Sequence, residues 1–106
     1  MGLFEFAQKP DINEGVKTCA ATPGAMLLDV RNPDEYALGH IPGSVNLPLS
    51  EIRTAEERIP DPDTPLFVYC LSGARSSRAV AALQSMGYTN LRNLGGISKW
   101  SGDVEK

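Results

Sequence analysis

Cys70 is the side chain of this sequence best placed for chemistry. It follows an apolar run at residues 66–69 and precedes a short loop containing Gly73, after which a helix is expected from Ser76. The start of a helix offers unpaired N–H groups and the positive end of the helix dipole, and both favour a thiolate over a thiol. Because the thiolate is the reactive form of cysteine, this stretch predicts a nucleophile.

The loop after Cys70 is short enough to bind an anion through its backbone. Four residues separate Cys70 from Arg75, and Gly73 allows a backbone angle that other residues resist. Successive N–H groups of such a loop can point inward and hold a thiolate, or a persulfide anion that is one atom longer. With no histidine or carboxylate inside the loop, catalysis would depend on a low cysteine pKa. Three side chains would project outward and line the mouth: Leu71, Ser72 and Ala74.

Arg75 has two interpretations that the sequence leaves open. Its planar guanidinium could bind an anionic donor. It could instead be structural and form an ion pair with Asp29 below the loop, because a buried arginine needs a partner. Arg78, one helical turn further, is either solvated or part of a basic rim around the site.

The charge is unevenly distributed along the chain. Residues 1–63 carry eleven acidic and five basic side chains, whereas residues 64–102 carry four basic side chains and no acidic one. The basic part contains the cysteine loop, which suits a small anionic substrate, although chance explains the asymmetry equally well. Four basic residues without interleaved aromatic residues do not suit nucleic acid.

The number of cysteines and the hydropathy of the chain bear on metal binding, secretion and membrane insertion. Two cysteines are too few for a disulfide framework, and with the single His40 they form no zinc-ligand pattern, so neither a metal nor another cofactor is expected. The N-terminus lacks the features of a secretion signal, and the chain lacks an apolar run of about 18 residues. We therefore expect a cytoplasmic protein without a membrane span.

Apolar runs alternate with helix signals along the whole chain. Strands are expected near residues 3–6, 25–30, 44–47, 66–70 and 88–94, and helices from residue 11, over residues 33–38, 50–58 and 76–86, and around Trp100. This alternation predicts one α/β domain over residues 1–106, with helices on both faces of a mainly parallel sheet of about five strands. Cys70 and Asp29 would lie at the carboxyl edge of that sheet, where ligands bind in such folds.

Four other residues are possible helpers, and each also has a structural interpretation. Cys19 lies on the apolar face of the first helix and is interpreted as a core residue, with a resolving thiol for Cys70 as the alternative. His40 is interpreted as a hydrogen-bonding group of a turn rather than a base. Ser76 is interpreted as the N-cap of the helix after the loop, and Trp100 as a core anchor.

Three segments in the same order resemble the single-domain rhodaneses, a family of sulfurtransferases. The first joins Leu28-Asp29-Val30-Arg31 and Glu35-Tyr36 to the stretch from Gly39 to Asn46. The second is the loop Tyr69-Cys70-Leu71-Ser72-Gly73-Ala74-Arg75-Ser76, and the third is Gly95-Gly96 followed by Trp100. The resemblance covers the chain from about residue 26 to its end and implies a three-layer α/β/α rhodanese-like domain.

The resemblance also implies a ping-pong reaction. Cys70 would take the outer sulfur of an anionic donor such as thiosulfate, become a persulfide and pass the sulfur to a thiophilic acceptor such as cyanide. Backbone N–H groups of residues 71–76 would hold the negative charge, Arg75 would help position the donor, and Asp29 and Arg31 would support the loop. A persulfide relay or docking module acting on a sulfur-accepting protein is the alternative.

A cysteine phosphatase or arsenate reductase is the less favoured rival. Those enzymes share the thiolate, the amide nest and the arginine, but they resemble a pattern with five residues between cysteine and arginine. Here there are four, which makes a smaller ring that suits sulfur better than a tetrahedral phosphate.

Overall fold

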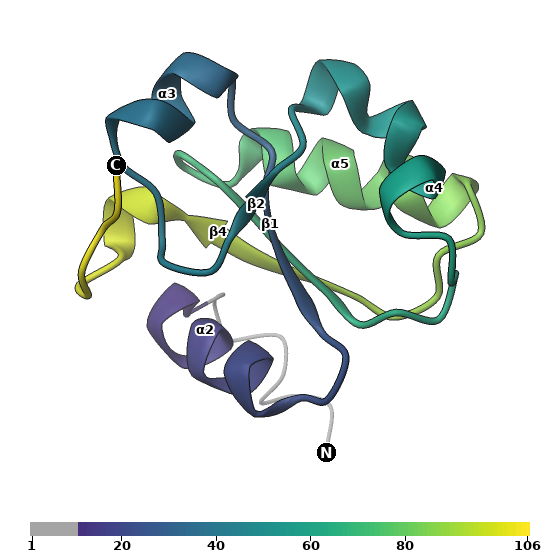
Figure 1. Ribbon diagram of the computed structural model, residues 1–106, viewed down its shortest axis with the longest axis horizontal. Helices are drawn as coiled ribbons and strands as arrows, with labels where there is room; N and C mark the ends of the chain where they lie inside the picture. Colours follow the sequence, from purple (N-terminus) through teal and green to yellow (C-terminus); the bar gives the residue numbers. More distant parts are fainter. Residues whose placement is uncertain (1–10) are drawn as a thin grey trace, which may run out of the picture.

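A parallel sheet forms the centre of the described part of the chain (Figure 1). The computed structural model describes residues 11–106, and within them the strands are β1 (Met26–Asp29), β2 (Val45–Asn46), β3 (Leu66–Cys70) and β4 (Leu91–Gly96), in the order β2-β1-β3-β4. The prediction of a mainly parallel sheet is confirmed, but the sheet has four strands and not about five. The additional strand expected at residues 3–6 lies outside the described residues.

Helices cover both faces of this sheet, as the three-layer prediction requires (Figure 1). One face carries α2 (Ile12–Ala21), and the other carries α5 (Ala74–Ser85) with the 3-10 helix η1 (Leu49–Thr54) and the short α4 (Ala55–Arg58). The helix α3 (Pro33–Leu38) follows β1, and the 3-10 helix η2 (Ile97–Lys99) follows β4. The helix expected over residues 50–58 is therefore split into a 3-10 and an α segment.

The alternation of side chains along β3 divides the core into two parts. Leu66, Val68 and Cys70 point to the face that packs against α5, whereas Phe67 and Tyr69 point to the face that packs against α2. All five residues of β3 are buried, as expected for a central strand of a parallel sheet. The sulfur of Cys70 thus belongs to the α5 side.

Local signals at the two N-terminal helices act as the sequence indicates. The carboxylate of Asp11 caps α2 by accepting hydrogen bonds from the N–H groups of Asn13 and Glu14. In α3, Pro33 occupies the first turn, and the Glu35 carboxylate accepts a hydrogen bond from the Asn32 N–H at 2.9 Å. The same carboxylate also accepts hydrogen bonds from Arg75.

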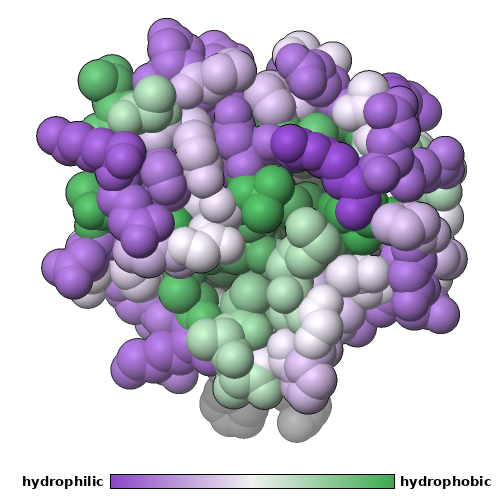
Figure 2. Space-filling model, in the orientation of Figure 1, coloured by the Kyte–Doolittle hydropathy of each residue, from purple (hydrophilic) through white to green (hydrophobic). Residues whose placement is uncertain are grey.

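The helices of the described part are too short or too polar to cross a membrane. On the face shown in Figure 2, apolar side chains gather near the centre, and hydrophilic side chains surround them.

Candidate active site

The Cys70 sulfur lies at the carboxyl end of β3 inside a nest of backbone amides. The residue is only 1% exposed, and its Sγ accepts hydrogen bonds from the N–H groups of Gly73 at 3.0 Å and Ser76 at 3.3 Å. The loop closes around the sulfur because Gly73 adopts a φ of +110°, in the left-handed region that favours glycine. The nest predicted from the spacing of Gly73 is therefore present, and it is occupied by the sulfur.

These contacts shift the ionisation of Cys70. Burial raises the pKa of the thiol, but hydrogen bonds from Ser76 and from the N–H groups of Gly73 and Ser72 lower it by more, so the pKa lies below its ordinary value. The N-terminal end of α5 faces the sulfur and favours the same direction. The contacts of the loop therefore favour the thiolate over the thiol, and they come from Ser76 and from backbone N–H groups.

Ser76 is not the N-cap of α5, as the sequence interpretation had it. The helix begins at Ala74, directly after Gly73, because the left-handed turn at Gly73 brings the chain into helical geometry two residues earlier. Ser76 is consequently the third residue of the helix, fully buried, and its N–H group and hydroxyl both face the sulfur. The residues expected to line the mouth are indeed outside: Leu71, at 46% exposure, and the exposed Ser72 and Ala74.

Arg75 forms an ion pair with Glu35 of α3, not with Asp29. Its Nη1 and Nη2 atoms donate to the two carboxylate oxygens at 2.7 and 3.0 Å, in a bidentate arrangement between half-buried side chains. The hydrogen bonds from Arg75 lower the pKa of Glu35 from 4.5 to about 2. This pair ties the cysteine loop to α3, a connection between residues 40 positions apart that no local pattern indicates.

Asp29 is unavailable to Arg75 because it pairs with Arg31. The two side chains are buried and joined by hydrogen bonds of 2.7 to 3.1 Å, and Arg31 also donates to the carbonyl of Gly39 at 2.7 Å. The guanidinium of Arg31 lies 5.9 Å from the ring centroid of Tyr69, the residue before Cys70. The pair therefore positions the segment that carries α3, which supports the loop through the Glu35–Arg75 contact.

The end of β4 forms the other wall of the loop. A Cβ atom at Gly96 would lie 2.0 Å from the carbonyl oxygen of Leu71, so only glycine allows β4 to approach the loop this closely. Asn93, which sequence reasoning missed, accepts a hydrogen bond from the Ser76 hydroxyl at 2.7 Å and another from the Gly95 N–H at 2.9 Å. Its position two residues before the pair Gly95-Gly96, at the carboxyl end of the last strand, was the only available signal.

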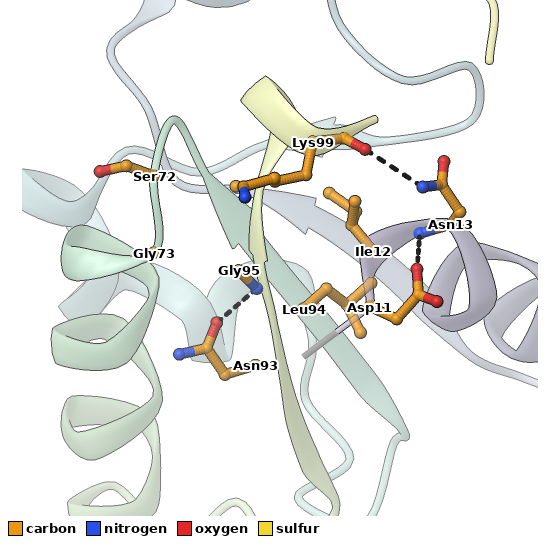
Figure 3. Close-up of a pocket in the computed structure, with 10 residues that line it drawn as sticks. Asp11, Ile12, Asn13, Ser72, Gly73, Asn93, Leu94, Gly95 and Lys99 are labelled. Carbon is orange, nitrogen blue, oxygen red and sulfur yellow. Dashed lines mark hydrogen bonds between the residues drawn. The ribbon is translucent and has the colours of Figure 1, made fainter. Parts of the chain in front are cut away.

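A cavity of about 720 Å³ lies beside the loop (Figure 3). Its lining includes Ser72 and Gly73 from the loop, Asn93 and Gly95 from β4, and two charged residues, Lys99 and Asp11. Gly73 lines the cavity and also donates its N–H group to the sulfur, so the cavity adjoins the wall of the nest. Its size suits a small molecule.

His40 and Cys19 hold structural positions. The Nδ1–H group of His40 donates to the carbonyl of Tyr36 at 2.8 Å, and the two rings stack with centroids 3.7 Å apart. Cys19 is buried on the α2 side of the sheet and lines an apolar groove of about 320 Å³, and burial raises its pKa. Because Cys70 belongs to the opposite side of the sheet, the two sulfurs are separated by the strands.

Trp100 packs against the α2-side core, as expected. The described residues contain no cluster of three or more potential metal ligands among His, Cys, Asp and Glu.

Residues 13–103 match the family described as the Rhodanese-like domain. The chain belongs to the rhodanese-like family. The thiosulfate sulfurtransferase PspE of Escherichia coli is 38% identical over 71 residues, which are 66% of this chain and 68% of that protein. The protein YqhL of Bacillus subtilis is 42% identical over 82 residues, and the matched part covers 76% of this chain and 64% of YqhL. The structure of the human single-domain sulfurtransferase TSTD1 superposes with a TM-score of 0.73 at 30% identity, covering 88% of this chain and 96% of that one.

Proposed function

We propose that this rhodanese-like domain transfers sulfane sulfur through a persulfide on Cys70. The observation that carries the proposal is the Cys70 sulfur held by the N–H groups of Gly73 and Ser76, with a pKa below its ordinary value. A thiolate at neutral pH is the attacking group that sulfur transfer requires. The relatives named sulfurtransferases support the same reaction.

In the first half-reaction the Cys70 thiolate attacks the outer sulfur of thiosulfate. A bond forms between Sγ and that sulfur, the sulfur–sulfur bond of thiosulfate breaks, and sulfite leaves with the electron pair. The product is a persulfide whose negative charge lies on the new outer sulfur. The N–H groups of Ala74 and Arg75, in the first turn of α5, have no partner within the helix and are the groups we assign to that charge.

In the second half-reaction a thiophilic acceptor attacks the outer sulfur. The bond to Sγ breaks, its electron pair returns to Cys70 as a thiolate, and cyanide as acceptor would leave as thiocyanate. The exposed Leu71 and Ala74 at the mouth would also tolerate a protein that accepts sulfur. A small donor together with a small or protein acceptor is therefore our proposal for the partners.

We assign Arg75 to positioning rather than to donor binding. Both ends of its guanidinium are occupied by Glu35, so the donor's charge is left to the backbone of residues 71–76. In the same scheme Asp29, the last residue of β1, and Arg31, two residues further, support the loop through the position of α3.

Mass spectrometry of the intact protein tests the function directly. Incubation with thiosulfate should add one sulfur atom, cyanide should remove it, and Cys70→Ser should show neither adduct nor thiocyanate formation. Cys19→Ser is the matched control and should load sulfur normally. Turnover retained by Cys70→Ser would contradict the proposal, and the absence of an adduct together with hydrolysis of an aryl phosphate would indicate a phosphatase.

A further inference from the structure

The hydroxyl of Ser76 is surrounded by acceptors that compete for its single proton. Its Oγ lies 2.7 Å from Oδ1 of Asn93, 3.0 Å from the Gly73 carbonyl, 3.5 Å from the Gly95 carbonyl and 3.5 Å from Sγ of Cys70. A serine hydroxyl has one proton to donate and two lone pairs with which to accept. By distance, Asn93 is the preferred acceptor of that proton.

A second hydrogen bond fixes the orientation of the Asn93 side chain. Oδ1 of Asn93 also accepts from the Gly95 N–H at 2.9 Å, the contact drawn as a dashed line in Figure 3. Turning the amide over would place its NH₂ group against this N–H donor. Asn93 therefore presents an oxygen, not a nitrogen, to the Ser76 hydroxyl.

The hydrogen bonds around Ser76 suit the thiol form of Cys70 better than the thiolate form. As a thiol, Cys70 donates its proton to Oγ of Ser76 while the hydroxyl donates to Asn93, so every group is satisfied. As a thiolate, Cys70 would be stabilised by a hydrogen bond donated by the Ser76 hydroxyl. Turning that proton to the sulfur would leave two oxygen atoms 2.7 Å apart with no hydrogen between them.

We propose that Asn93 is a positioning residue for Cys70, because it holds the Ser76 hydroxyl proton and so limits its donation to the Cys70 thiolate. The inference rests on the nucleophilic role assigned to Cys70 above. Its consequence is that the negative charge is stabilised chiefly by backbone N–H groups. In a persulfide the charge moves from Sγ to the outer sulfur, so a hydroxyl whose donation to Sγ is limited favours that state over the free thiolate.

Substitutions of Asn93 and Ser76 leave the charged groups around the loop unchanged. Arg75 on α5 is paired with Glu35 of α3, and Asp29 of β1 is paired with Arg31. Lys99 of η2 lines the same cavity as Gly73. If replacing Asn93 shifts the pKa of Cys70 when Ser76 is present but not when it is replaced by alanine, the shift therefore comes from the Ser76 hydroxyl.

A double-mutant cycle between Asn93 and Ser76 tests the proposal. The pKa of Cys70 is measured without any donor, from the ultraviolet absorbance of the thiolate, with the Cys70→Ser form of each variant as the baseline. Asn93→Ala should lower the midpoint by about half a pH unit, which is about a threefold rise in the ratio of thiolate to thiol, the size expected for one hydrogen bond. In the Ser76→Ala background, Asn93→Ala should leave the midpoint unchanged.

The cycle also separates this role from a general effect on the fold. Loss of the contact to Gly95 is common to both backgrounds and cancels, and Asn93→Leu, which removes the acceptor while filling its space, should give the same shift if Asn93→Ala folds poorly. An equal shift in both backgrounds, or a rise in the pKa with Ser76 present, would overturn the proposal. Because no donor is used, a failure of sulfur loading would reject the proposed function and not this inference.

Discussion

The ion pair between Glu35 and Arg75 offers the most quantitative test of how the loop is supported. Glu35→Gln removes the negative charge but keeps an oxygen that can accept from the Asn32 N–H group. Charge-assisted hydrogen bonds contribute about 1.5–3 kcal/mol when buried, and exposed pairs contribute about 0–1 kcal/mol. With side chains 30% and 28% exposed, the pair lies between these limits, and we expect a loss of about 1–2 kcal/mol in the free energy of unfolding.

The pH dependence of this loss follows from the pKa of Glu35. Because Arg75 holds that pKa at about 2 in the folded protein, below its usual 4.5, the stabilisation is complete above 4.5 and is lost as the pH falls toward 2. The free energies of unfolding of the wild-type protein and of Glu35→Gln are measured with urea. The difference between them should be smaller at pH about 3.5 than at neutral pH, by about 1 kcal/mol. Glu51→Gln, at an exposed glutamate of η1, is the matched control and should change stability by less than about 0.5 kcal/mol.

A double-mutant cycle with Arg75→Gln gives the result that would refute the reasoning. The coupling energy between Glu35 and Arg75 should be about 1 kcal/mol or more, and a value near zero would show that the contact does not stabilise the fold. The same variants test the role of Arg75. If Arg75 positions the loop, Glu35→Gln and Arg75→Gln should impair thiosulfate turnover alike. A rise in the KM for thiosulfate with Arg75→Gln alone would instead make Arg75 a donor-binding residue.

Further substitutions test the close approach of β4 to the loop and the role of Cys19. Gly96→Ala should abolish sulfur loading, because the added methyl group would meet the backbone of Leu71, whereas Gly15→Ala, whose methyl group would meet only the movable side chain of Leu94, should destabilise the fold but still load sulfur. Both are read by unfolding and by the mass of the thiosulfate-treated protein, and normal loading of Gly96→Ala would refute the close-approach argument. Cys19→Ala should leave the rate of thiosulfate turnover nearly unchanged, since the sheet separates it from the site. A large loss of turnover in a folded variant would make Cys19 a resolving thiol.

The local features of this protein could be predicted from the chain alone. The apolar run before Cys70, the glycine three residues after it and the helix signals that follow are enough to place a cysteine in an amide nest, because backbone geometry depends on a few neighbouring residues. The outward side chains of the loop and the cap of α2 were predictable for the same reason. The boundary of α5 was not, because a left-handed Gly73 starts the helix without a side-chain cap.

The partners of the site residues depend on the tertiary structure. Asp29 and Glu35 are both plausible partners for Arg75, and only the position of α3 against the loop, with Asp29 already bound to Arg31, selects Glu35. The contact of Ser76 with Asn93 and the approach of Gly96 to Leu71 likewise require β4 to lie beside β3. Local patterns determine where a nucleophile and its nest can form. Packing between distant segments determines which groups hold the loop closed and which groups compete for its protons, because those contacts exist only once the strands have paired.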